Sequence, residues 1–183
     1  RWAWPPLSSA GSASASGRVR RKDMPSGLCV GAGGDPCQQW RDNGYEVVRL
    51  DIDPATSPDI VGTMTDLGNI GPYDAVYCIH ALEHLYPHEV PVALSEFRRV
   101  LRQGGVATIA VPDLEGVPPT DDKLPGIDVS GLHLYYGDAA QIPTNPHMAH
   151  HCGFVASTLG EAMKAAGFSS VRTLRLSQFN LMG

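Results

Sequence analysis

The sequence predicts an α/β protein, a three-layer sandwich in which a mostly parallel sheet carries helices on both faces. From Gly27 onward, short apolar runs alternate with segments of helical period, which is typical of strands joined by crossover helices. The run from Tyr73 to Ile79 is apolar in character, as expected of a strand covered on both faces. At 183 residues, the chain has room for one domain with a continuous core.

The elements follow in chain order. Six short apolar runs predict strands, at residues 28–30, 45–50, 59–62, 73–79, 106–111 and 171–176. Three segments predict helices, at residues 36–43, 90–102 and 159–166. Gly44, the glycine pair at 104–105 and Gly167 follow these helices as caps, and Pro112 ends the strand before it. The connection from Asp53 to the third strand is too brief for a crossover helix, so we expect shortened N-terminal and edge helices.

Two segments fall outside this alternation. Residues 1–24 combine tryptophans and prolines with a Ser/Ala/Gly tract and a basic run, and we expect a mobile N-terminal arm before a domain at 25–183. Residues 113–153 hold five prolines, five glycines and four of the seven histidines, with little periodicity. This composition predicts a long functional loop or lid that determines substrate specificity.

Composition limits the partners. The net charge of −5 and the pI near 5.7 argue against nucleic acid, which binds to basic surfaces. No apolar run is long enough to span a bilayer, and the four cysteines form no Cys-x-x-Cys pair, which fits a reduced compartment. We therefore expect a cytoplasmic protein that acts on a small molecule, with no nucleic-acid or membrane partner. The sequence does not determine its oligomeric state.

A glycine-rich turn and an acidic residue follow the first two strands. The turn containing Gly31 lets a ligand approach the backbone, and Asp51 is placed to bind both hydroxyls of a ribose. Pro36 stands where the dinucleotide fingerprint has a third glycine, which argues against a dehydrogenase. A glycine turn by itself is also compatible with an ordinary tight turn.

Four motifs in order strengthen the assignment. They are LCVGAG at 28–33, VRLDI at 48–52, YDAVYCIHALEHL at 73–85 and RRVLRQGG at 98–105, with a later echo at 159–168. Over about residues 27–176 the chain thereby resembles the class I methyltransferases, specifically the type 11 group. The resemblance implies a Rossmann-like fold and S-adenosylmethionine-dependent methyl transfer to a small-molecule oxygen or nitrogen. A catalytically silent cofactor-binding module and an NAD-dependent oxidoreductase are the alternatives.

The resemblance also implies roles for individual residues. Three backbone positions would lie against the methionine part and ribose of the cofactor: Gly31, Ala32 and Gly33. Asp51 would hold the ribose hydroxyls and Ile52 would pack on the adenine. Three residues would edge the adenine ring: Met64, Thr65 and Asp66. His80 would face the methionine end, while Cys29 and Thr63 stand where the family usually has acids.

The motif His80-x-x-Glu83-His84 would place three polar side chains on one face of a helix after the fourth strand. As His-x-x-Glu-His it matches an inverted zinc-peptidase motif, but no third ligand is evident at a telling spacing. It is also similar to the Glu-x-x-Glu-His of ubiquinone-pathway O-methyltransferases, which can bind a divalent metal. The favoured interpretation is packing and hydrogen bonding, so we assign no metal ligand.

Candidates for the chemical step come from histidines and one carboxylate. Methyl transfer requires positioning, plus a base when the nucleophile is a hydroxyl, and an imidazole titrates near working pH. Among the histidines near the end of the 113–153 loop we select His150, with His84 as the second candidate. Asp113, directly after the fifth strand, is a third candidate on the substrate side. The alternative for each histidine is a surface or packing role.

Overall fold

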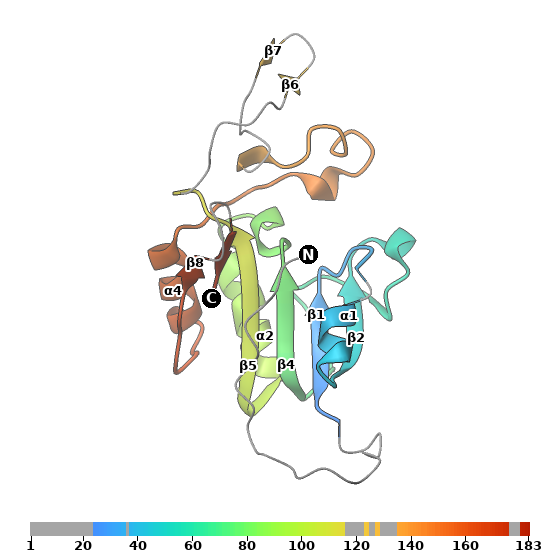
Figure 1. The fold of residues 1–183 in the computed structure, drawn as a ribbon, viewed down its shortest axis with the longest axis vertical. Helices are drawn as coiled ribbons and strands as arrows, with labels where there is room; N and C mark the ends of the chain where they lie inside the picture. The colour runs from blue at the N-terminus through green and yellow to red at the C-terminus, as the bar shows by residue number, and fades with distance from the viewer. Residues whose placement is uncertain (1–23, 36, 116–122, 125–126, 129–134, 176–179) are drawn as a thin grey trace.

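The structure, a computed structural model, describes residues 24–35, 37–115, 123–124, 127–128, 135–175 and 180–183 (Figure 1). The arm predicted at 1–24 lies outside the described residues except for Met24. In the described residues, no helix has the length and apolar character needed to cross a membrane.

Within the described residues, the main sheet has seven strands in the order β3-β2-β1-β4-β5-β9-β8. Five run parallel: β1 (Ser26–Val30), β2 (Glu46–Asp51), β3 (Ile60–Val61), β4 (Tyr73–Ile79) and β5 (Leu101–Pro112). The last two, β8 (Leu174–Arg175) and β9 (Asn180–Met182), form an antiparallel pair, and β9 also runs antiparallel to β5. The strand order reverses at β1, which lies between β2 and β4. Ligands of open α/β sheets bind beyond the carboxyl ends of the strands at such a point.

Helices cover both faces of the sheet (Figure 1). The five-residue α1 (Gln38–Asp42) lies over β1 and β2, while α2 (Val90–Val100) and α4 (Ala156–Ala165) cover the other face. In the connections that the structure describes, 3₁₀ turns lie at Pro54–Thr56, Leu82–His84 and Pro146–Met148. A separate two-stranded sheet pairs β6 (Lys123–Leu124) with β7 (Ile127–Asp128). The predicted three-layer sandwich and the short first helix are confirmed.

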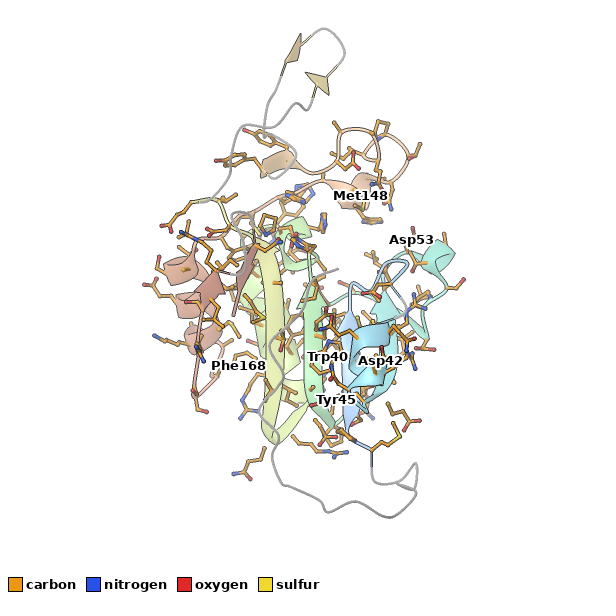
Figure 2. The ribbon with its side chains drawn as sticks, viewed as in Figure 1. Trp40, Asp42, Tyr45, Asp53, Met148 and Phe168 are labelled. Atoms are coloured by element: carbon orange, nitrogen blue, oxygen red, sulfur yellow. The ribbon has the colours of Figure 1, made fainter. Side chains whose placement is uncertain are left out.

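Alternation along the strands divides the core into two layers. In β1, Leu28 and Val30 join the large cluster that contains Phe97 of α2, whereas Cys29 joins the smaller cluster around Trp40 of α1. Successive strand residues point to opposite faces, so a parallel strand covered on both sides must be apolar throughout. The ring of Trp40 contacts that of Tyr45 edge-on, with centroids 4.8 Å apart (Figure 2).

Several predicted boundaries differ from the structure. The helix predicted at 90–102 ends at Val100, because Leu101 is already extended and pairs with Tyr73 at the start of β5. The glycine pair at 104–105 therefore lies inside β5 instead of capping the helix. In the described part of the strand predicted at 171–176, residues 171–175, only β8 is extended. Sequence reasoning missed β9, which inserts between β8 and β5.

Candidate functional site

A cavity of about 530 Å³ opens at the carboxyl ends of the parallel strands. Its walls come from the connections after β1, β2, β3 and β4, and from the segment 141–148 of the long loop. Figure 2 shows Met148 and Asp53, two of the lining residues, at this end of the sheet. The predicted location of the site, across the ends of the first, second and fourth strands, matches this cavity.

The glycine turn after β1 is held by β2. The N–H groups of Gly31 and Ala32 donate to the carbonyl of Leu50, at 2.9 and 3.2 Å. Gly31 and Gly33 have left-handed φ values of +64° and +51°, which favour glycine. A Cβ on Gly31 would lie 2.3 Å from the Cβ of Ala81, whereas a Cβ on Gly33 would meet nothing within 4 Å. The turn thus packs tightly at its start and leaves open space beside Gly33.

Asp51 closes this turn at the end of β2. Its Oδ2 accepts the N–H of Gly33 at 2.6 Å, and its Oδ1 accepts that of Asp53 at 2.8 Å. Each carboxylate oxygen has two lone pairs, so both oxygens keep one for a ligand. The side chain lines the cavity although the residue is only 7% exposed. A fixed carboxylate with two remaining acceptor positions suits a pair of vicinal hydroxyls.

Of the four residues expected to contact adenine, the structure places two in the cavity lining. Ile52, which is 47% exposed, and Met64 both line the cavity. Thr65 and Asp66 do not: the hydroxyl of Thr65 lies 2.9 Å from that of Thr63, and Asp66 accepts the N–H of Gly68. Thr63 lines the cavity in their place.

Cys29 gives the cavity no charge. Its side chain points to the α1 side of the sheet and packs with Cys37. The hydrogen bond with Cys37 and then burial raise the pKa of the Cys29 thiol. The thiol is therefore neutral and lies outside the cavity lining, so any cofactor must be held by other groups.

After β4 the chain turns sharply at His80, which has a left-handed φ of 49° and lines the cavity. The helix expected to carry His80, Glu83 and His84 on one face is reduced to the 3₁₀ turn Leu82–His84, with His80 outside it. His80 Nδ1 lies 3.3 Å from Oε1 of Glu83, and this hydrogen bond raises the pKa of His80. His84 instead contacts the long loop, with Nδ1 3.0 Å from the carbonyl oxygen of Ala149.

The three candidates for the chemical step are not equivalent. His84 lines the cavity, and His150 lies behind it, with ring centroids 4.8 Å apart and the rings nearly perpendicular. Asp113 is fully buried, forms an ion pair with Arg175, accepts the N–H of Glu115 and does not line the cavity. The structure therefore brings His84 and His150 together and places Asp113 apart from them.

Sequence reasoning missed two groups of site residues. Arg49 donates to the carbonyls of Gly33 (2.8 Å) and Thr56 (3.2 Å), which ties the glycine turn to the connection after β2. A basic residue two positions before Asp51, in a strand that also contains Val47, Val48 and Leu50, was the available signal. The long loop contributes four lining residues: Gln141, Asn145, His147 and Met148. The composition of residues 113–153 predicted a functional loop but did not select these four residues.

The fold is Rossmann-like, and the cavity at the ends of its strands offers groups that suit a ribose-containing cofactor. Comparison with known proteins specifies the class. A family model described as a methyltransferase domain, of the type 11 group, matches residues 28–109. Residues 28–109, just under half of the chain, therefore match the domain of class I, S-adenosylmethionine-dependent methyltransferases, as the resemblance implied. The NAD-dependent oxidoreductase is not supported.

Solved structures of low sequence identity share the fold. The 1,6-didemethyltoxoflavin-N1-methyltransferase of Burkholderia thailandensis, with bound 1,6-didemethyltoxoflavin and S-adenosylhomocysteine, has a TM-score of 0.62 at 19% identity, over 87% of this chain and 69% of that one. A protein of Pyrococcus horikoshii gives 0.62 at 16% identity, over 88% and 81%. An S-adenosylmethionine-dependent methyltransferase of Mesorhizobium loti gives 0.60 at 15%, over 87% and 89%. The curated proteins contain no match.

The residues present fit S-adenosylmethionine. The open space beside Gly33 is a cradle that any Cβ there would fill. Asp51 keeps two acceptor positions, and the exposed side chain of Ile52 offers an apolar surface in the same cavity. Gly33 would let the cofactor approach the backbone, Asp51 would accept the hydrogens of the two ribose hydroxyls, and Ile52 would contact the flat adenine ring.

Proposed function

We propose that the protein transfers a methyl group from S-adenosylmethionine to an oxygen or nitrogen of a small molecule. The observation that carries this proposal is the cavity itself, which joins the glycine turn and Asp51 to a histidine-containing wall formed by β4 and the long loop. When bound, the cofactor supplies an electrophilic methyl group on a sulfonium. The protein then has to hold both reactants in line and manage one proton.

We place the cofactor along the first half of the cavity. The backbone of Gly31, Ala32 and Gly33 would bind the methionine part and ribose, and Asp51 would accept the hydroxyl hydrogens. Ile52 and Met64 would contact the adenine, with Thr63 taking the edge position first assigned to Thr65 and Asp66. His80 would lie at the methionine end, at the sharp turn after β4.

The acceptor would then occupy the other half, between the β4 turn and the long loop. A carbonyl oxygen only accepts, so the contact of His84 Nδ1 with Ala149 requires a proton on Nδ1 and leaves the lone pair on Nε2. His84 is therefore in the tautomer needed to receive a proton from the acceptor. His150, behind His84, would act by positioning it, and Asp113 would hold Arg175 instead of meeting the acceptor.

The long loop would determine which acceptor fits. Gln141, Asn145, His147 and Met148 offer amide, imidazole and thioether groups to the cavity. Such a mixture suits a small heteroaromatic or hydroxylated molecule with a few polar atoms. The 1,6-didemethyltoxoflavin-N1-methyltransferase, which shares this fold and has 1,6-didemethyltoxoflavin bound, supports a small-molecule acceptor.

The test is methyl transfer to a panel of phenols, catechols, purines and other nitrogen heterocycles, with methyl-labelled S-adenosylmethionine. The expected result is label in at least one organic product, together with S-adenosylhomocysteine. Asp51→Ala and His84→Gln should both reduce the rate, the first by weakening cofactor binding and the second with the binding of S-adenosylhomocysteine unchanged. Tight cofactor binding without turnover on any acceptor would support the catalytically silent module and contradict the proposal.

A further inference from the structure

Three potential ligand groups meet next to the cavity, although they come from two distant parts of the chain. One oxygen of Glu83, one ring nitrogen of His84 and one of His150 lie within 4.8 Å of one another. Glu83 and His84 belong to the 3₁₀ turn after β4, and His150 belongs to the long loop. The sequence offered no third ligand for the His-x-x-Glu-His motif, and the fold supplies one.

Glu83 carries an unsatisfied oxygen. The residue is 1% exposed, and its Oε1 lies 3.3 Å from His80 Nδ1. Within the described part of the chain, its Oε2 has no hydrogen-bond partner. Burial of a carboxylate oxygen without a partner is costly, and such groups in native structures indicate an ion, a water or a functional role. A cation between Glu83 and the two imidazoles would satisfy this oxygen.

His84 is prepared to act as a ligand. Its Nδ1 donates to the carbonyl of Ala149 at 3.0 Å, which fixes the ring and leaves the Nε2 lone pair for coordination. Metal-binding histidines almost always use their second nitrogen in this way, to a carbonyl or a carboxylate.

The loop that carries His150 is anchored to the same turn. The carbonyl of Glu83 accepts the N–H groups of His151 (2.9 Å) and Cys152 (3.2 Å), and the N–H of His150 donates to the carbonyl of Tyr136 at 3.1 Å. These bonds hold the backbone on both sides of the His150 side chain. The three groups are thus preorganised by backbone hydrogen bonds and not by an exposed, flexible contact.

We propose that Glu83, His84 and His150 bind a divalent transition metal, with zinc as the preferred ion. Two imidazoles and one carboxylate, with a fourth position left open, form a known type of catalytic zinc site. His84 also lines the cavity, so the open position is accessible to a small molecule there. The site that sequence analysis assigned to packing would therefore be a metal centre.

The role of the ion rests on the proposed methyl transfer. A hydroxyl of the acceptor would take the fourth position, where the charge of the metal lowers the pKa of the hydroxyl and its proton leaves to solvent. The oxygen then forms a bond to the methyl carbon while the carbon–sulfur bond breaks, and the electron pair stays on sulfur to give the thioether. When the ion is bound, its charge replaces the His84 lone pair in promoting loss of the proton.

The test is metal binding by the full chain, purified without a histidine tag, stripped with a chelator and titrated with Zn²⁺. We expect one equivalent per chain, and an affinity at least about tenfold lower in Glu83→Gln, His84→Gln and His150→Gln. His88→Gln is the matched control, because His88 is exposed and stacks only on Tyr86 among the contacts described, and it should bind zinc like the wild type. Titration with Co²⁺ adds a visible spectrum that reports nitrogen ligands directly.

Each outcome decides one claim. No zinc binding by the wild type, or wild-type zinc affinity in both His84→Gln and His150→Gln, overturns the metal site. Glu83 is buried, so its variant is judged only if its circular dichroism matches the wild type, and His150→Gln, at a half-buried loop position, keeps the test decisive if it does not. Methyl transfer that resists the chelator overturns the metal's role and leaves the proposed function intact. Zinc binding without transfer to any acceptor supports the site and counts against the function.

Discussion

Gly31 and Gly33, both in the glycine turn after β1, should respond differently to substitution by alanine. Both have positive φ, so an alanine at either position places an L-residue in the left-handed region, at a cost of about 1–2 kcal/mol. At Gly31 the new Cβ also lies 2.3 Å from the Cβ of Ala81, so the turns after β1 and β4 must move apart. Overpacking of this kind costs about 1–3 kcal/mol more.

We therefore expect Gly31→Ala to lower the free energy of unfolding by about 2–5 kcal/mol and Gly33→Ala by about 1–2 kcal/mol. Gly34→Ala is the control, because its Cβ also meets nothing within 4 Å and its φ is not left-handed. It should stay within about 0.5 kcal/mol of the wild type. Urea unfolding followed by circular dichroism measures all three.

Cofactor binding separates the same variants in a second way. A Cβ on Gly33 enters the open space beside the cavity, so Gly33→Ala should fold and yet bind S-adenosylhomocysteine at least about tenfold more weakly, a loss near 1.4 kcal/mol. Equal destabilisation by Gly31→Ala and Gly33→Ala would refute the packing argument. If Gly33→Ala folds and binds S-adenosylhomocysteine with wild-type affinity, the cofactor does not occupy the open space beside Gly33.

Three further predictions address the surroundings of the turn. Asp51→Ala should weaken S-adenosylhomocysteine binding by roughly 1–3 kcal/mol in calorimetric titration, the scale of lost charged hydrogen bonds, and unchanged affinity would place the ribose elsewhere. Arg49→Met should lower both the urea midpoint and the cofactor affinity, because its bonds to Gly33 and Thr56 disappear; a fall in stability alone would show that the turn does not depend on them. Burial favours a higher pKa for Asp74, but hydrogen bonds from Ser26 outweigh it and hold the pKa below its usual value. The stability that Asp74 adds is therefore complete above the unfolded pKa of about 3.9 and is lost as the pH falls through the lower folded pKa. Asp74→Asn should cost about 1 kcal/mol or less at pH 6, and the gap to the wild type should close in acid; a gap that persists would exclude the carboxylate as its cause.

The central strands could be predicted because their signal is local. The strand predicted from the apolar run at 73–79 has the same bounds as β4 in the structure. A strand that is buried on both faces needs apolar side chains at consecutive positions, so the sequence shows it directly. The end of α2 could not be predicted in this way. Leu101 has helical neighbours in sequence, and its extended backbone is set by pairing with Tyr73 on another strand. The short β9 was missed because only pairing with β5 and β8 makes it a strand.

The candidate site likewise combines residues that local sequence predicts with residues that only tertiary contacts bring together. Gly31, Gly33 and Asp51 follow directly from their positions at strand ends, and the structure places all three in the cavity. Of the residues expected to edge the adenine, Met64 lines the cavity, whereas Thr63 lines it in place of Thr65, two positions further along the chain. The meeting of His150 with Glu83 and His84 depends on how the long loop folds back, and no local pattern encodes it.

The most direct measurement of the central claim is calorimetric titration of the wild-type chain with S-adenosylmethionine, S-adenosylhomocysteine and NAD, beside Asp51→Ala. The account predicts binding of one equivalent of each sulfur ligand to the wild type, no heat from NAD, and a loss of affinity in the variant. Binding of NAD with no response to either sulfur ligand would contradict it.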